Sequence, residues 1–340
     1  MNGMDAMPMS IGMFIPEAMP SQEAVDFAVG LEDAGFDTAW FTEIDRDPFV
    51  RCAATVARTQ RIKVATGIAQ WTRSPVAMAM AAAELHQLSD GRFNFGLGAG
   101  TAQSNQAHHN IDFDRPVSRM AEYLQVLHGT WVAQSEPFEF LGEYFTVRGL
   151  HQTVFSGARP PLFLAAVGDN MLRLAARLAD GVLLNPSTSA PHVKTHVLPQ
   201  VRAAAAQAGR SLDGFQRAVC LRASVDTDRA LARERARQGI AEYGRYPIHL
   251  AQYARYGFGR EAECIRDALA KNDTPAAVAA VSDDMVDLLG IAGTPDEVRR
   301  AIRQWEGVVD SVALMPPSHG LSLDELRANC WVLADVFAAS

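Results

Sequence analysis

The feature that most constrains this chain is one pattern that recurs eight times: a short apolar run, a polar loop and an amphipathic stretch of helical period. The predicted strands are apolar at nearly every position, as a parallel sheet buried on both faces requires. Eight such strands alternating with helices favour a closed (β/α)8 TIM barrel over an open doubly wound sheet. The predicted strands cover residues 9–15, 38–41, 62–68, 93–97, 161–166, 182–184, 218–225 and 310–315.

Two stretches interrupt this alternation. A loop-and-hairpin segment at about 134–160 delays the fifth strand, and residues from about 244 to 290 have a helical pattern without a strand. A chain of 340 residues exceeds the usual domain length but lies within the range of α/β barrels. We therefore expect one barrel domain over residues 1–340 with two insertions.

Charge and apolar content exclude several classes of partner. The chain carries 31 basic and 39 acidic residues, a formal charge of −8, which argues against a surface that tracks nucleic-acid phosphates. The longest apolar run, Val76 to Ala83, has eight residues, whereas a membrane-spanning helix needs about 18 or more. Residues 1–9 lack the pattern of a secretory signal. We expect a cytoplasmic protein that does not bind nucleic acid or cross a membrane.

The cysteines and histidines do not have the spacing of a metal site. Cys52, Cys220, Cys264 and Cys330 lie 44 or more positions apart, and no H-E-x-x-H motif occurs. We expect four reduced, mostly buried thiols and no bound metal.

In a barrel of this class the active site forms where the strands end, which selects candidate residues directly. Glu43 follows the second strand, Glu17 follows the first, and His108 and His109 lie in the predicted loop 102–113 after the fourth strand. Histidine and carboxylate side chains are the usual groups for moving protons. Each also has a structural interpretation: Glu43 as the partner of an arginine or a helix cap, and Glu17 and His108 as solvated loop residues.

Two strand ends expose backbone N–H groups beside small side chains. The run Gly98, Ala99, Gly100 and Thr101 is not a dinucleotide fingerprint, because Thr101 stands where the third glycine of G-x-G-x-x-G belongs. The run Ala166, Val167 and Gly168 leads into a predicted helix, whose N-terminus favours an anion. Both runs allow the backbone to approach a flat ring or a phosphate, although the glycines also relieve crowding at a barrel rim.

The order of the motifs resembles the bacterial luciferase-like superfamily. The similar segments include 12–16, 34–43, 66–75, 88–100, 165–168, 179–181 and 293–297, and so span most of the chain. This superfamily comprises (β/α)8 barrels that use reduced FMN or the deazaflavin coenzyme F420. The segments Pro16 to Pro20 and Asp47 to Phe49 are closer to the F420 branch, and Thr101 stands where many FMN monooxygenases have tryptophan.

The resemblance implies a role for each candidate residue. Glu43 would meet the deazaflavin edge. Gly67, Ile68 and the following Ala69 would support the back of the ring through a cis peptide bond between Gly67 and Ile68. The runs 98–101 and 166–168 would flank the ribityl and phosphate portion. The candidates for the proton are Glu43, His108 and then Glu17. Where some relatives have a histidine after the carboxylate, this chain has Ile44.

The implied function is hydride transfer between F420 and a small organic substrate that the sequence does not identify. Two alternatives stay open: an FMN-dependent monooxygenase on the same barrel, and a non-catalytic protein that binds F420 or flavin. The resemblance also implies a homodimer or a larger homo-oligomer.

Overall fold

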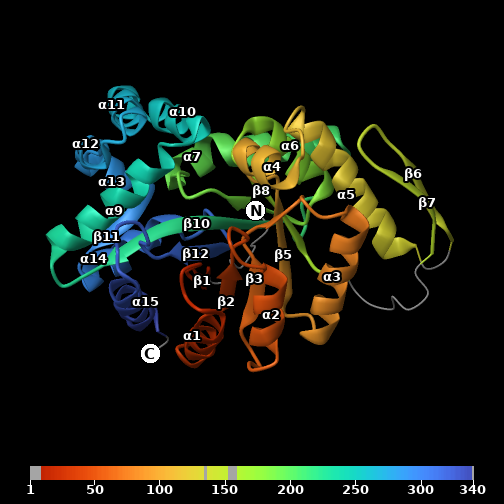
Figure 1. Ribbon diagram of the computed structural model, residues 1–340, viewed down its shortest axis with the longest axis horizontal. Helices are drawn as coiled ribbons and strands as arrows, with labels where there is room; N and C mark the ends of the chain where they lie inside the picture. Colours follow the sequence, from red (N-terminus) through yellow and green to blue (C-terminus); the bar gives the residue numbers. More distant parts are fainter. Residues whose placement is uncertain (1–8, 134–135, 152–158, 339–340) are drawn as a thin grey trace, which may run out of the picture.

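Eight parallel strands close into a barrel in the computed structural model, which describes residues 9–133, 136–151 and 159–338 (Figure 1). In sequence order the strands alternate with the helices that surround them. Around the barrel β10, β12, β1, β2, β3, β5, β8 and β9 follow one another, and a β9–β10 pairing closes the ring. The predicted TIM barrel is confirmed. The strands are β1 (Ser10–Phe14), β2 (Thr38–Phe41), β3 (Lys63–Thr66), β5 (Phe93–Gly98), β8 (Leu162–Ala166), β9 (Gly181–Leu184), β10 (Gln216–Val225) and β12 (Ser311–Met315).

Helices cover the outside of the barrel, and their ends follow local sequence rules. Pro48 and Pro75 occupy the first turns of α2 and α3, where the missing N–H costs nothing. The backbone N–H groups of Thr294 and Ser322 donate to glutamates three residues ahead, which caps α14 and α15. The covering helices are α1 (Ser21–Asp33), α2 (Pro48–Val56), α3 (Pro75–Leu88), α5 (Pro116–Val132), α6 (Asp169–Leu178), α7 (Ala190–His192) with η1 (Val193–Val197) and α8 (Leu198–Gln207), α9 (Arg229–Tyr243), α14 (Pro295–Ala301) with η2 (Ile302–Trp305), and α15 (Leu323–Phe337).

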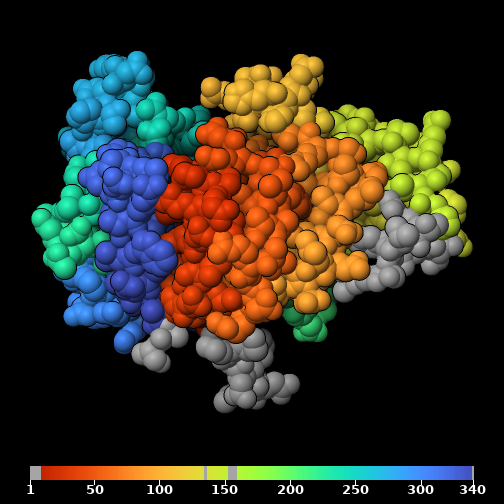
Figure 2. Space-filling model, turned by 60° about the horizontal axis from the view of Figure 1, so that its bottom comes forward, coloured from red at the N-terminus to blue at the C-terminus, as the bar shows by residue number. Residues whose placement is uncertain are grey.

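The apolar strands face two cores. Side chains alternate along a strand, so one set packs outward against the helices and the other fills the barrel. On β10, Val219 and Leu221 belong to the large outer core, whereas Cys220 belongs to an interior cluster with Trp40 and Phe163. Figure 2 shows the first strand–helix units in red and orange beside the blue C-terminal helix. This neighbourhood follows from the pairing of β1 with β12.

The two interrupting stretches contain elements outside the alternation. A hairpin of β6 (Phe138–Leu141) and β7 (Thr146–Leu150) lies at one edge of the molecule. Helices α10 (Pro247–Arg255), α11 (Gly259–Ala270), α12 (Thr274–Ala279) and α13 (Asp283–Leu289) share an apolar cluster with the end of α9. A short strand that was not predicted, β11 (Gly290–Gly293), then pairs with β10. The boundaries of the domain and its insertions remain predictions.

The sequence interpretation is wrong at the loop after the fourth strand. Residues predicted as loop 102–113 include a helix, α4 (Ala102–His109). The Thr101 side chain accepts a hydrogen bond from the Ser104 N–H and so begins the helix, and Asn110 ends it in a left-handed conformation with φ 52°. The predicted third strand, 62–68, ends earlier, at Thr66, and a separate short strand, β4 (Ala69–Gln70), follows the cis peptide bond between Gly67 and Ile68.

Within the described ranges, no helix is long and apolar enough to span a bilayer, and no group of three or more candidate ligands could hold a metal ion. The four cysteines are free thiols, of which Cys52, Cys220 and Cys330 are buried and Cys264 is exposed. Burial raises the pKa of Cys220 and of Cys330 to about 12, so both thiols are protonated near neutral pH.

Candidate active site

Glu43 lies just beyond β2, where its carboxylate is held from two sides. The Gln70 N–H donates to Oε2 at 2.7 Å, and Arg73 pairs with Oε1 at 3.2 Å and with Asp47 at 2.7 Å. The Gln70 side-chain amide donates to the Glu43 carbonyl at 2.6 Å. The side chain is 16% exposed. The structure thus contains the arginine partner that a structural role of Glu43 would require. The same contacts fix the orientation of the Glu43 carboxylate at the barrel mouth.

Glu17 ties the loops after β1 and β2 together. Its Oε2 accepts from the Thr42 hydroxyl at 2.5 Å, and its Oε1 accepts from the N–H groups of Asp45 and Arg46 at 2.9 and 2.8 Å. Both oxygens are thus occupied by neighbouring loop residues. These contacts let Glu17 hold the segment that carries Glu43, and the proton-transfer role for which Glu17 was the third candidate stays a prediction.

The cis bond predicted between Gly67 and Ile68 is confirmed, and the structure brings this segment onto the end of β5. A Cβ at Gly98 would lie 2.2 Å from Ile68 Cδ1 and 3.2 Å from Ala165 Cβ, so the Ile68 side chain lies directly over Gly98. Gly67 packs against the rings of Phe14 and Trp40. The predicted candidates Gly67, Ile68 and Gly98 therefore form one surface, whereas the side chain of Ala69 is fully buried in the outer core.

Asn105 organises the glycine run, a role that the sequence analysis missed. Its amide nitrogen donates to the carbonyls of Ala99 and Thr101 at 2.7 and 2.8 Å, and its oxygen accepts from the indole of Trp71 at 2.6 Å. Gly100 has φ +69°, a left-handed conformation that glycine adopts without strain. No motif distinguishes Asn105 from other polar residues of a helix, so only its burial identifies it.

His108 and His109 are exposed on the last turn of α4, with their rings 6.4 Å apart. The structure shows no hydrogen bond from either described ring to Glu43 or Glu17. The predicted proton-transfer role of His108 stays a prediction.

The run Ala166 to Gly168 ends at the N-terminus of α6, as predicted. Gly168 is exposed, and a Cβ there would meet no atom within 4 Å. The next residue, Asp169, accepts from His196 at 2.8 Å, and that hydrogen bond holds the pKa of the carboxyl below its usual range. The backbone at Gly168 is therefore open to a ligand, and the neighbouring carboxylate already has a partner.

On the opposite side of the mouth, β9 and β10 end in buried polar groups. Arg222 and Ser224 follow Cys220 at alternate positions of β10 and so face the barrel interior. Arg222 stacks on Tyr243, with its guanidinium carbon 4.4 Å from the ring centre, and Tyr243 contacts the sulfur of Met315. The sequence analysis did not select Arg222, although the alternation of side chains along β10 identifies it as facing the interior.

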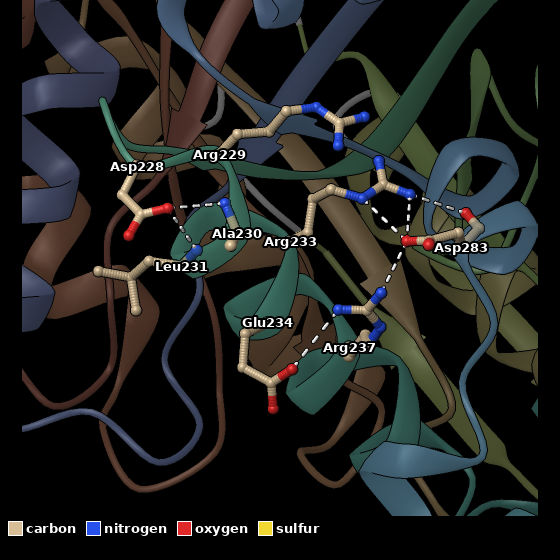
Figure 3. A pocket seen from close by; sticks show the side chains of 8 residues that line it. All are labelled: Asp228, Arg229, Ala230, Leu231, Arg233, Glu234, Arg237 and Asp283. Carbon is tan, nitrogen blue, oxygen red and sulfur yellow. Dashed lines mark hydrogen bonds and ion pairs between the residues drawn. The ribbon is translucent and has the colours of Figure 1, made fainter.

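A surface hollow at the start of α9 is a different place. Figure 3 shows Arg233 and Arg237 directed at Asp283. Each guanidinium lies 2.6 Å from the Asp283 carboxylate, and Arg233 also pairs with Asp287. The charges in this hollow neutralise one another, so we assign it a structural role.

The residues around the mouth fit a flat, partly anionic cofactor. Ile68, whose side chain covers the buried Gly98, offers an apolar surface, and the backbone at Gly168 is open beside a helix N-terminus. The Glu43 carboxylate lies on the loop after β2, and Gln70 and Arg73 fix its orientation.

Comparison with known proteins identifies the family of this chain. A family model described as luciferase-like monooxygenase matches residues 5–311. The chain is 31% identical over 317 residues to the 5,10-methylenetetrahydromethanopterin reductase of Archaeoglobus fulgidus, with 89% of this chain and 92% of the relative covered.

Two solved structures share the fold at low identity. The coenzyme F420-dependent tetrahydromethanopterin reductase from Methanopyrus kandleri has a TM-score of 0.81 at 24% identity, with 98% of each chain covered. The oxygenating constituent of 3,6-diketocamphane monooxygenase from Pseudomonas putida, in complex with FMN, has a TM-score of 0.69 at 19% identity, with 98% and 97% covered. From the family match and the reductase relative, the chain belongs to the luciferase-like monooxygenase family.

Proposed function

We propose that this protein is a coenzyme F420-dependent oxidoreductase that transfers a hydride between the deazaflavin and a small organic substrate. The observation that carries the proposal is the surface formed by Ile68 over Gly98, joined to an open backbone at Gly168. The relative of 31% identity, whose name describes a reductase, supports it. The structural likeness to an F420-dependent reductase supports the same barrel architecture.

The chain's own residues would bind and orient the cofactor. Gly67 and Ile68 would support one face of the ring, Gly98 to Thr101 would line the adjoining backbone, and Ala166 to Gly168 would receive the phosphate portion at the start of α6. Asn105 would keep the glycine run in place through its two carbonyl contacts.

When bound, F420 supplies a carbon centre that carries two electrons as a hydride. Glu43 would hold or move a proton at its carboxylate, because it is the candidate that lies at the mouth with restrained geometry. Glu17 would support it by fixing the loop through Thr42 and Arg46. Exposed His108 would have a role only if a bound ligand reached α4.

A second candidate is an FMN-dependent monooxygenase, which the family description and the likeness to an FMN-bound monooxygenase favour. A non-catalytic protein that binds F420 or flavin is the third. The family membership also supports a homodimer or larger homo-oligomer, which sedimentation analysis of the purified protein would test.

The test is to titrate the purified protein separately with F420 and FMN while tryptophan fluorescence is measured. A Cβ at Gly67 would lie 2.9 Å from the Trp40 ring, so a ligand on this surface should quench Trp40. We expect saturable quenching by F420 and weaker quenching by FMN. Tighter FMN binding with NAD(P)H-dependent oxygen uptake would establish the monooxygenase instead, and binding of neither would overturn the proposal.

A matched pair of glycines localises the site. Gly168→Val fills open space beside the proposed cofactor, whereas Gly259→Val fills open space at the start of α11. Neither added Cβ meets an atom within 4 Å, so both variants should fold. We expect Gly168→Val alone to weaken F420 binding; equal affinities would remove 166–168 from the site.

A further inference from the structure

Arg222 is a buried arginine that the proposed hydride transfer does not use. It lies near the carboxyl end of β10, is 4% exposed and faces the barrel interior. Its Nη1 donates to the Pro186 carbonyl just after β9. Nε and Nη2 are buried and meet no acceptor in hydrogen-bond geometry among the described residues, although the hydroxyl of Tyr253 lies close to the guanidinium. Because buried polar groups are nearly always paired, these two nitrogens require an explanation.

The two unpartnered nitrogens have the geometry of a carboxylate receptor. In a guanidinium group the N–H of Nε and one N–H of Nη2 lie on the same edge and point in parallel. Such an edge binds both oxygens of a carboxylate at once, and that bidentate pairing is the strongest that arginine makes. With Nη1 held by Pro186 and the plane stacked on Tyr243, the edge is fixed in orientation.

The surroundings of Arg222 leave its charge without a counterion. No described carboxylate lies within ion-pair distance of it. Burial, and then the charge of Arg222, lower the pKa of the adjacent His249 to about 4, so that ring is neutral near pH 7. Burial also lowers the pKa of His319, to which the charge of Arg222 contributes. A buried positive charge without a partner is costly, and a bound anion removes that cost.

Another buried arginine shows that the arrangement is specific to Arg222. Arg51 also has two unpartnered nitrogens, but these are Nε and Nη1, which do not share the parallel edge. Its Nη2 donates to the Met19 carbonyl, and the charge of Glu17 acts on it. Arg51 lies on α2, outside the barrel. It therefore differs from Arg222 both in which nitrogens are unpaired and in its position.

Three further buried polar atoms lie on the elements around Arg222. Asn185 Nδ2 follows β9, Ser224 Oγ is one alternate position further along β10, and His249 Nδ1 comes from α10. None makes a hydrogen bond of acceptable geometry among the described residues, although Gln252 contacts the His249 side chain. The His249 ring contacts the same Tyr243 on which Arg222 stacks, at 5.0 Å between centres. Unpaired donors thus gather on the side of the mouth opposite Glu43.

We propose that Arg222 binds a carboxylate of the substrate through its Nε–Nη2 edge, so that the enzyme acts on an organic acid. This assignment of the substrate class rests on the proposed oxidoreductase function. Asn185 and Ser224 add polar contacts to the same acid. The reacting carbon then lies between this anchor and the cofactor surface at Ile68 and Gly98.

The test is isothermal titration of the folded protein, with and without F420, using acids and their neutral isosteres. The probes are acetate against acetamide, propanoate against propanamide, and benzoate against benzamide, with inorganic phosphate as a separate arm. We expect at least one acid to bind about tenfold or more tightly than its amide, and more tightly than phosphate. Arg222→Gln should abolish this preference, and Arg222→Lys, which keeps the charge but not the paired edge, should retain only part of it.

Several outcomes would overturn the assignment. These are equal binding of every acid and its amide, an unchanged preference in both variants, tighter binding of phosphate, or displacement of the acid by F420, which would place the carboxylate on the cofactor. F420 affinity of each variant is measured in parallel by fluorescence and should stay unchanged. If acids bind in an Arg222-dependent manner but F420 does not bind, the proposed function fails while the carboxylate site stands.

Discussion

The two sides of the barrel mouth differ in how their charges are partnered. On the side of β2 and β4, Glu43 and Arg73 pair with each other, and Glu17 accepts three hydrogen bonds from nearby loop residues. On the side of β9 and β10, Arg222 keeps two unpaired nitrogens, and Asn185 and Ser224 each keep one unpaired polar atom. The charged groups of the first side are partnered, although Gln70 Oε1 there is buried without a hydrogen-bond partner, whereas on the second side the charged Arg222 keeps unpaired nitrogens.

The difference separates two tasks that an enzyme of this kind must perform. A carboxylate that is already held by partners needs little free energy to reorient when a ligand binds. It can therefore keep a constant geometry toward a cofactor common to the family. Unpaired buried groups discriminate strongly between ligands, because a molecule that lacks the matching group leaves them unsatisfied. We infer that the β2–β4 side serves the cofactor and the β9–β10 side selects the substrate.

The largest effect is expected from Glu43→Gln. If Glu43 moves the proton, turnover should fall by about 10²- to 10⁴-fold, whereas F420 affinity should change little because the amide occupies the same space. The measurement is steady-state turnover with F420 and an identified substrate, together with fluorescence titration of the cofactor. Full turnover in this variant would remove Glu43 from the mechanism.

Glu17→Gln is the matched control on the same side of the mouth. The amide keeps one oxygen for the two backbone N–H groups but presents an NH2 group to the Thr42 hydroxyl and removes the charge, so we expect a stability loss of about 1–3 kcal/mol. Turnover per folded molecule should stay within a few-fold of the parent. A turnover loss as large as that of Glu43→Gln would contradict the structural role given to Glu17.

A smaller effect is expected from Asn105→Ala, which tests how firmly the cofactor side is built. The substitution removes three hydrogen bonds and leaves the buried Trp71 indole N–H without its acceptor. Denaturant unfolding should show a loss of about 2–4 kcal/mol, and F420 binding should weaken because the glycine run loosens. Gln106→Ala, at an exposed position of the same helix, should change stability by less than about 0.5 kcal/mol.

The smallest effect concerns the pH dependence of stability on the β9–β10 side. Burial, with the charge of Arg222, lowers the pKa of His249 to about 4, against 6.5 for an ordinary histidine; a contact with Gln252 opposes the shift. Between these values the unfolded chain binds the proton that the folded chain refuses, so stability falls as the pH drops from 6.5 to 4. His249 also faces the rings of Tyr243 and Tyr246 on the neighbouring segment.

From pH 6.5 to pH 4, we expect the free energy of unfolding to fall by about 1–3 kcal/mol less in His249→Gln than in the parent. The measurement is denaturant unfolding at a series of pH values. Exposed His109→Gln is the control and should leave the pH dependence unchanged. An identical slope in His249→Gln and the parent would show that this ring is protonated as readily in the folded state as in the unfolded state.

Sequence reasoning found the elements but not all of the contacts. The eight barrel strands lie close to their predicted ranges, because apolar runs bounded by polar loops act locally. Helix α4 was missed because its mean composition is polar, and only Thr101 and Asn110 mark its ends. Asn105 and Arg222 were missed because burial, not residue type, separates them from solvated residues.

By itself, the sequence determined the barrel, the family and the strand ends where chemistry is expected, since each depends on periodicity and on motifs contiguous in the chain. Only the tertiary structure decided that Arg73 pairs with Glu43, that Ile68 lies over Gly98 and that the paired edge of Arg222 lacks an acceptor. Those properties depend on which segments meet when the ring of strands closes. Hydrogen bonds and burial act over a few ångströms in space, whatever the separation along the chain.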